Sequence, residues 1–301
     1  MTTTARVELS APPVAPRARR RRGLLGLLAA PTGFLALFFL VPVLMVAAYS
    51  VGLLTLLPHD LYLSLQPWRD FFASETHVGL FWKSVRLSVV VSAVSVLLAY
   101  PIAYALALVA GRRKYTLLLV ILAPFLTSYL LRVLAWRVIL GDEGLIITLL
   151  RDVGVLGPEG QISWLFYSPF AVYVVLAYVW VPFVALPIFV TLDGMDRDLL
   201  EASHDLGATR WTTFLRVTLP LSVPGVVAAF VFVFIPTIGE YVTPLLVGGP
   251  NGFFFGNAIQ GAILQGFDWQ FGAAMAMFLV GTVTVLLVLF GRYLNVRAVA
   301  E

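Results

Sequence analysis

Long apolar segments alternate with short polar ones along the chain. Six segments are long enough to cross a hydrocarbon layer of about 30 Å, which takes roughly 20 helical residues. They cover 24–54, 85–110, 116–140, 167–192, 221–247 and 271–290. Lipid offers backbone groups no hydrogen-bonding partner, so each segment must be helical. The pattern therefore predicts an all-α, polytopic membrane protein with six transmembrane helices.

The composition agrees with this pattern. Of 301 residues, 60% are hydrophobic and 12% are charged, against roughly 45–50% and about 25% in soluble domains. The surplus of apolar residues cannot be buried inside a soluble fold of this length, so part of it must face lipid. The chain has no cysteine, and its histidines, His59, His77 and His204, are scattered. We therefore expect neither a metal site nor a cofactor.

The basic residues are concentrated on one side of the predicted spans. Five arginines between Arg17 and Arg22 directly precede the first apolar segment, which is longer than the ~7–15 residues of a signal-peptide core. Such a cluster usually stays in the cytoplasm and touches anionic lipid rather than nucleic acid. Most other lysines and arginines fall in segments that would share this side. We therefore predict that both termini are cytoplasmic (N-in/C-in).

These features divide the chain into four parts. Residues 1–22 form a predicted disordered, basic cytoplasmic tail, and 23–81 the first transmembrane helix with an extracytoplasmic loop. Residues 82–292 form a core of five helices that includes the longest cytoplasmic loop, 193–220. Residues 293–301 form a second cytoplasmic tail.

The loop 193–220 reads DGMDRDLLEASHDLGATRWTTFLRVTLP and is dense in charge between two apolar spans. Asp198 and Glu201 have capping-box spacing, which predicts the start of a short helix. Gly207 is placed to end this helix in a left-handed turn. A second short helix is expected to begin near Thr209 and to lead to Pro220. One face of the first helix carries Leu199, Ala202, Ser203 and Leu206.

Fixed positions in this loop resemble a motif of ABC importer permeases, the EAA loop, whose pattern is E-A-A-x3-G-x9-I-x-L-P. Two residues differ mildly from the pattern, since Ser203 replaces the second alanine and Val217 replaces the isoleucine. The matching residues are Glu201, Ala202, Gly207, Leu219 and Pro220.

The resemblance implies a type I ABC importer permease fold and a mechanical role for the loop. In that family the short helix docks on a cytoplasmic ATPase subunit, which works as a dimer. A second permease subunit completes the pathway, and an extracytoplasmic solute-binding protein delivers the substrate. The residues that the resemblance assigns to coupling are Asp198, Glu201, Ala202, Ser203, Asp205 and Gly207.

The chain itself lacks an ATP-hydrolysing motif. Its two lysines, Lys83 and Lys114, do not have the glycine context of a P-loop, so we expect hydrolysis by a separate subunit and no enzymatic activity here. A membrane-embedded enzyme is an alternative, but no HExxH, GxSxG or paired acidic motif occurs. An ATP-independent channel or carrier would have no use for the charged loop. The expected location is a bacterial cytoplasmic membrane.

Several stretches are similar to spermidine/putrescine permeases, namely LAPFLTSYLLRVLAWRVIL, IPTIGEYVTPLLVGGP and GFDWQFGAA. One departure is Ile147, where these relatives often have asparagine. The resemblance implies polyamine import. The alternatives within the same class are thiamine, ferric iron, sulfate or molybdate, and a phosphonate.

Few polar residues within the spans are candidates for a substrate path. Glu240 with Tyr241, and Asp268 with Trp269, combine a carboxylate with an aromatic ring, which suits ammonium groups. As an alternative, Glu240 pairs with Arg132 or Arg137, and Asp268 and Trp269 anchor a span end at the interface. On the third span, Tyr129 and Arg132 share one helix face with Trp136. Arg132 would repel a polyamine and by itself favours an anion.

Overall fold

The computed structural model describes residues 17–54, 63–141, 143–157, 160, 162 and 164–300, with side chains between residues 29 and 291 of these ranges. All regular structure in this part of the chain is helical, as predicted. The α-helices are α1 (Arg17–Ser50), α2 (Gln66–Ala73), α3 (Glu75–Tyr104), α4 (Lys114–Leu122), α5 (Tyr129–Leu140), α6 (Leu145–Asp152), α7 (Pro169–Asp193), α8 (Asp198–Asp205), α9 (Arg210–Thr213), α10 (Leu219–Ile238), α11 (Val242–Val247), α12 (Phe255–Leu264) and α13 (Trp269–Ala300).

Short segments of other helix types join these elements. Two are π-helical, η1 (Ala105–Val109) after α3 and η4 (Phe214–Thr218) before α10. Three are 3₁₀ turns: η2 (Gly111–Arg113), η3 (Ala123–Leu126) and η5 (Pro250–Gly252). Thus η1 directly continues α3, and η4 leads directly into α10.

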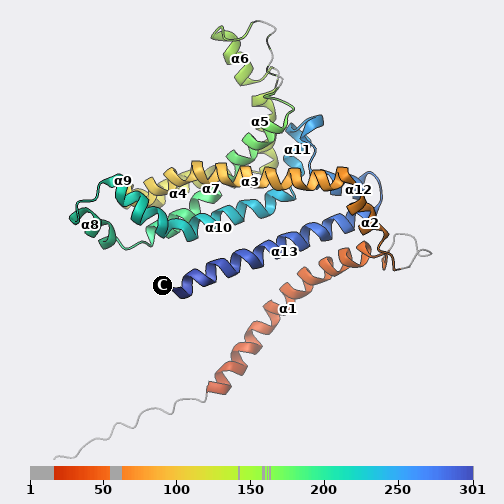
Figure 1. Ribbon diagram of the computed structural model, residues 1–301, viewed down its shortest axis with the longest axis horizontal. Coiled ribbons are helices and arrows are strands. Elements are labelled where there is room, and N and C mark those ends of the chain that lie inside the picture. The colour runs from red at the N-terminus through yellow and green to blue at the C-terminus, as the bar shows by residue number, and fades with distance from the viewer. Residues whose placement is uncertain are drawn as a thin grey trace, which may run out of the picture.

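Five helices of the described chain are long and apolar enough to cross a membrane, and a bent pair in the third predicted span raises the number to six if it counts as one. The helices α1, α3, α7 and α13 correspond to the first, second, fourth and sixth predicted spans. In Figure 1, α3, α7 and α13 lie roughly along one direction, with α8 and α9 at one end and α2 and α12 at the other, and α1 runs obliquely away from them.

The helices α3, α7 and α10 pack against one another and form the centre of the bundle. Small residues allow their close approach, which is the usual basis of helix packing in lipid. Ser84, Ser88, Ser92 and Ser95 form a buried stripe along α3. On α10, Gly225 faces α7 so closely that a Cβ atom there would overlap the side chain of Thr191.

The third predicted span, 116–140, is not one straight helix. The segments Gly111–Leu126 and Tyr129–Asp152 meet at 82°, and α5 and α6 project across the direction of the other long helices (Figure 1). Pro124 cannot donate a backbone hydrogen bond, and Thr127 and Ser128 are extended. The hydroxyl of Thr127 bonds the carbonyl of Pro124 at 2.6 Å and closes the end of the first segment.

The fifth predicted span, 221–247, also breaks. Helix α10 ends at Ile238, and α11 starts separately at Val242. The break is packed against α12, because a Cβ atom on Gly256 would come within 2.5 Å of the carbonyl oxygen of Gly239. The predicted end at residue 247 is therefore wrong, and Glu240 lies between two helices instead of within one.

The first helix begins earlier than predicted. Helix α1 includes Arg17 and the arginines that follow, so the expectation of a disordered tail is wrong for 17–22, while 1–16 lie outside the described residues. Helix α1 packs along α13 at the edge of the bundle (Figure 1). Because α13 continues to Ala300, most of the predicted second tail is also helical.

Candidate functional site

The loop between α7 and α10 contains the two short helices that the sequence predicts. Helix α8 starts at Asp198, as expected, but the predicted capping box is wrong. The carboxylate of Asp196 accepts the backbone N–H of Asp198 at 3.0 Å instead. An acidic residue two positions before the helix thus satisfies one free N–H group of the first turn.

Gly207 ends α8 in the predicted left-handed conformation, with φ of +79°. The N–H of Gly207 bonds the carbonyl of His204 at 2.9 Å, and the N–H of Ala208 bonds the carbonyl of Ser203 at 3.1 Å. These two bonds form a Schellman motif, in which glycine is favoured because it lacks a Cβ atom.

Helix α9 follows at once and is joined to α8. The side chain of Thr209 accepts the backbone N–H of Thr212 at 3.2 Å and so caps the helix, near the predicted start. The hydroxyls of Ser203 and Thr213 are 2.8 Å apart and connect the two helices. Since Thr213 is buried, this bond is shielded from solvent and satisfies both hydroxyls.

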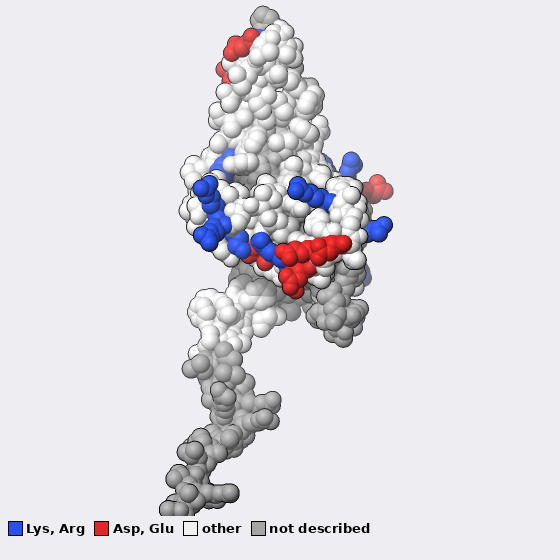
Figure 2. All heavy atoms as spheres, turned by 90° about the vertical axis from the view of Figure 1, so that its left-hand side faces the viewer, with Lys and Arg blue, Asp and Glu red and all other residues white. Residues whose placement is uncertain are grey.

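The outer surface of this helix pair is both charged and apolar. Leu199 is 47% exposed and Leu206 is 90% exposed, so the predicted apolar face is not covered by the chain's own bundle. Figure 2 shows acidic and basic side chains gathered on this end of the molecule. Exposed charged residues here include Asp196, Asp198, Glu201, Asp205, Arg112, Arg113, Arg197, Arg210 and Arg216.

Two polar contacts fasten the start of the loop to the bundle. Lys114 at the beginning of α4 pairs with Asp193 at the end of α7, with 2.5 Å between Nζ and Oδ1. Arg197 donates from Nη2 to the carbonyl oxygen of Ala107 within η1 at 3.4 Å. The loop therefore contacts the ends of three spans.

A second group of candidate residues meets where the two spans break. Helix α5 packs against α11, and the hydroxyls of Tyr129 and Thr243 are 2.5 Å apart. Glu240 and Arg132 both lie close to Tyr129. The fold thus brings together Tyr129, Arg132 and Glu240, with Tyr241 next to them. Interrupted helices that meet inside a bundle are a common setting for transport sites.

Glu240 makes a structural contact that the sequence did not predict. Its Oε1 accepts the backbone N–H groups of Val242 and Thr243 at 2.9 and 3.0 Å, so it caps the first turn of α11. The expected pairing with Arg132 or Arg137 is wrong, because the described residues contain a single ion pair, between Lys114 and Asp193. Arg137 donates instead to the hydroxyl of Tyr167 at 2.7 Å.

Arg132 is half-buried without an acidic partner among the described residues. Its guanidinium lies 4.3 Å from the ring centroid of Phe125, which gives a cation–π contact. Its Nε and Nη1 atoms are buried and bond no acceptor in the described structure. The indole nitrogen of Trp180 is buried in the same way.

Asp268 and Trp269 lie apart from this group. Helix α12 packs against Glu240 at its start and precedes Asp268 at its end, and its ten residues correspond to about 15 Å. The carboxylate of Asp268 caps α13 by accepting the N–H of Phe271 at 3.0 Å. Trp269 is near Tyr49 of α1, with 6.0 Å between ring centroids.

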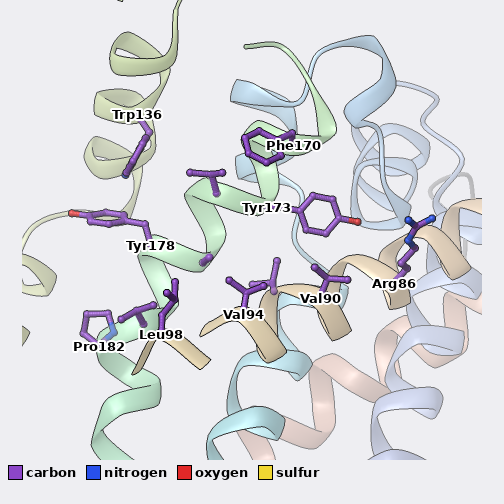
Figure 3. Close-up of a pocket in the computed structure, with 13 residues that line it drawn as sticks. Arg86, Val90, Val94, Leu98, Trp136, Phe170, Tyr173, Tyr178 and Pro182 are labelled. Carbon is purple, nitrogen blue, oxygen red and sulfur yellow. The ribbon is translucent and has the colours of Figure 1, made fainter. Parts of the chain in front are cut away.

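A cavity of about 810 Å³ lies between α3, α5 and α7. Figure 3 shows Arg86 at one end and aromatic side chains along the wall, among them Trp136, Tyr173 and Tyr178. Trp136 is one helical turn from Arg132, which links the cavity to the break in the third span. Sequence reasoning treated Trp136 as packing and missed Arg86, although an arginine near the start of an otherwise apolar span was a usable signal.

The fold and these two regions define a helical membrane permease with a charged, exposed loop at one end and interrupted helices inside the bundle. Comparisons with known proteins agree with this class of protein. Residues 19–299 match the family model "Binding-protein-dependent transport system inner membrane component". The spermidine/putrescine transport system permease protein PotB of Haemophilus influenzae is 31% identical over 86% of this chain and 89% of its own length. The molybdenum transport system permease protein ModB of Escherichia coli is 31% identical over 53% of this chain and 69% of its own.

A solved structure shows the same fold. The chain aligns with a subunit of a bacterial ABC transporter involved in the import of alginate, with a TM-score of 0.71, 17% identity and coverage of 93% of this chain and 97% of that one. The chain belongs to the family of inner-membrane components of binding-protein-dependent transport systems. It is a multi-pass bacterial inner-membrane protein and a permease subunit of an ABC importer.

Proposed function

We propose that this permease imports polyamines such as spermidine and putrescine. It would work with a pair of ATPase subunits, a second permease subunit and an extracytoplasmic solute-binding protein. In this arrangement the α8–α9 end faces the cytoplasm, as the distribution of basic residues favours. The observation that carries the substrate assignment is the similarity to a spermidine/putrescine permease over 86% of this chain.

The α8–α9 pair has the properties of a docking element for the ATPase. Its internal polar groups bond one another, through Ser203 and Thr213 and through the turn at Gly207. Its exposed surface offers leucines and carboxylates to a partner. We assign the docking surface to Asp198, Glu201, Ala202, Ser203, Asp205 and Gly207.

One feature of the region where the two spans break favours a cationic substrate. Glu240 has a half-buried carboxylate next to the hydroxyl of Tyr129, and Tyr241 follows it in the chain. Only one carboxylate oxygen is used to cap α11. A carboxylate with nearby aromatic rings suits a primary or secondary ammonium group. We assign Glu240, Tyr129 and Tyr241 to the substrate path, and Asp268 with Trp269 to its outer entrance.

A second candidate substrate is an oxyanion such as molybdate or sulfate. One observation favours it: two guanidinium nitrogens of Arg132 are buried without an acceptor. A charged donor in this state would gain from binding an anion. The similarity to a molybdenum permease covers a smaller part of the chain than the similarity to the polyamine permease, so we place this candidate second.

Two measurements test the proposal. The first is copurification: the ATPase encoded beside this gene should be retained by the tagged wild-type chain, and transport by the chain without any ATPase would contradict the importer mechanism. The second is ligand binding by the solute-binding protein of the same gene cluster. Retention of spermidine or putrescine, with no competition by molybdate or sulfate, is expected. The reverse preference would replace polyamines by the second candidate.

A further inference from the structure

Phe214 is the first residue of η4, directly after α9, and its ring packs between aromatic rings of another span. The ring centroid is 5.8 Å from those of both Tyr100 and Tyr104 on α3, edge to face in each case. The ring of Trp211 stacks on the Phe214 ring at a centroid distance of 5.5 Å. The loop thus contacts α3 through the rigid ring of Phe214, which packs against three other aromatic rings.

The part of α3 that receives this ring is easily deformed. Tyr100 and Tyr104 are one turn apart, and Pro101 between them removes a backbone hydrogen bond. The π-helical η1 begins directly after Tyr104, and η4 begins at Phe214 itself. Such π-segments hold an extra residue in a turn and are frequent at functional sites. The ring contact therefore joins two helices where each is irregular.

Deeper in the bundle, α3 and α10 are held together. The hydroxyls of Tyr100 and Ser222 are 2.9 Å apart, and Ser222 is fully buried. Beside the packed rings, in contrast, is a cavity of about 430 Å³ lined by the three rings of Tyr104, Trp211 and Phe214, together with Tyr100, Pro101 and Arg210. The end of α3 that follows Tyr100 therefore has space to move, while the contact between Tyr100 and Ser222 holds the rest of α3 in place.

The other end of the loop is attached differently. Asp193 is joined to α4 by the ion pair with Lys114, and Arg197 reaches η1 only through one long hydrogen bond, 3.4 Å, to the carbonyl of Ala107. We infer that Phe214 transmits the movement of the α8–α9 pair to the second span, and that 101–109 is the segment that flexes. This inference rests on the proposed coupling of the loop to an ATPase. It assigns Phe214 a transmitting role, with no contact to substrate or to the ATPase.

The test uses the complete transporter with its ATPase, second permease and binding protein. Phe214→Ala should retain the ATPase and hydrolyse ATP at the basal rate, while substrate taken up per ATP hydrolysed falls by about tenfold, within the range of measured coupling between sites. Tyr104→Ala should give the same defect from the other side of the contact. The double variant should be no worse than either single one, because both remove one interaction.

A matched control separates transmission from packing. Leu215→Ala removes a large apolar side chain from the same π-segment, but Leu215 is 44% exposed, so coupling should stay at the wild-type level. Phe214→Leu keeps apolar volume and loses the ring edges, and uptake per ATP should remain reduced by about twofold to tenfold, the value of an aromatic pair. Normal coupling in Phe214→Leu would overturn the inference in favour of simple packing.

A distance measurement gives an independent readout. Because the chain has no cysteine, a variant that carries both Arg113→Cys and Arg216→Cys can be spin-labelled at these two positions, which are exposed and lie in η2, after η1, and within η4. ATP should change the distance between them in the otherwise wild-type transporter and leave it unchanged with Phe214→Ala. If Gly207→Val uncouples the transporter while Phe214→Ala behaves as wild type, the inference fails and the proposed function stands. If the wild-type chain retains no ATPase, the proposed function fails as well.

Discussion

The α8–α9 loop and the region of the two helix breaks differ in whether their buried polar groups are hydrogen-bonded. In the loop, described throughout from Gly194 to Thr218, no buried side-chain nitrogen or oxygen lacks a partner, while leucines remain exposed. At the breaks, Arg132 has buried N–H groups without acceptors among the described residues, and so does Trp180 on the neighbouring α7. A surface whose buried polar groups are all hydrogen-bonded, but whose leucines are still exposed to solvent, is suited to bind a folded protein partner. An interior with unused donors suits a hydrated ligand that comes and goes.

The largest effect is expected from a substitution in the α8–α9 loop, and it tests whether this loop couples to a partner. Gly207→Val places a β-branched residue at φ of +79°, which costs about 1–2 kcal/mol in the left-handed region and favours another path for the chain. Uptake should fall by at least about tenfold, as expected when coupling between two sites is lost, while the protein still inserts. ATP hydrolysis and uptake, measured in the same vesicles, report the ratio.

Gly154→Val is the matched control for this prediction. Gly154 has φ of +80°, with no atom near the position of a Cβ, and it follows α6 outside the loop. The backbone strain is therefore the same and the location is different. Equal losses of uptake in the two variants would show that strain alone, and not the loop, is responsible.

The next effect tests the breaks. Glu240→Gln keeps a carbonyl oxygen that accepts the N–H groups of Val242 and Thr243, and it removes the charge. Uptake of spermidine should fall by roughly tenfold or more, because a hydrogen bond to a charged group contributes about 1.5–3 kcal/mol, and thermal stability should change little. Asp268→Asn makes the same exchange at the cap of α13 and should affect uptake less. A loss of expression with unchanged transport per molecule would leave Glu240 a structural cap only.

A smaller effect of opposite sign is expected at Arg132. If the cargo is a polyamine, Arg132→Gln removes a like charge from its path, and uptake should rise by about 1.4-fold to fivefold, which corresponds to the 0.2–1 kcal/mol typical of screened charge pairs. Arg137→Gln removes an equal charge from the same helix at an exposed position and should have no effect. A fall in polyamine uptake with Arg132→Gln would contradict this reasoning, and a fall in oxyanion uptake would support the second candidate.

The same contrast explains what the sequence could predict. The loop depends on contacts within about twenty residues, so Gly207, Thr209 and Pro220 were enough to predict its two helices. The long helices follow from apolar length, and four of the six predicted spans are single helices. The break after Ile238 packs against a neighbour far along the chain, Gly256 against the carbonyl of Gly239, whereas the break after Leu126 is closed locally by Thr127 on the carbonyl of Pro124. Apolar length continues across a break, so hydropathy gives no sign of it.

The same difference between local and long-range contacts separates the site residues that the sequence predicted from those that it did not. The loop residues were predicted together because they are close in sequence. Glu240 and Tyr129 are brought together by tertiary packing, and the sequence predicted a different partner for Glu240. Arg86 and Tyr173 line one cavity from two spans, and nothing in the spacing of either span relates them. Sequence reasoning therefore identified chemically costly residues within the spans, such as Glu240 and Arg132, but not the groups that surround them.

The smallest effect concerns the hydrogen bond between α8 and α9, and it depends on which partner is removed. Thr213 is buried and Ser203 is only half-buried. Ser203→Ala leaves a buried hydroxyl unsatisfied, which costs about 1–3 kcal/mol, whereas removal of both hydroxyls by Ser203→Ala with Thr213→Val is nearly neutral. Amide hydrogen exchange over α8 should therefore accelerate in the single variant and return toward wild type in the double one. Faster exchange in the double variant than in the single would show that the hydroxyl pair itself holds the two helices together, and that the loop is less complete in its own contacts than the comparison with the breaks requires.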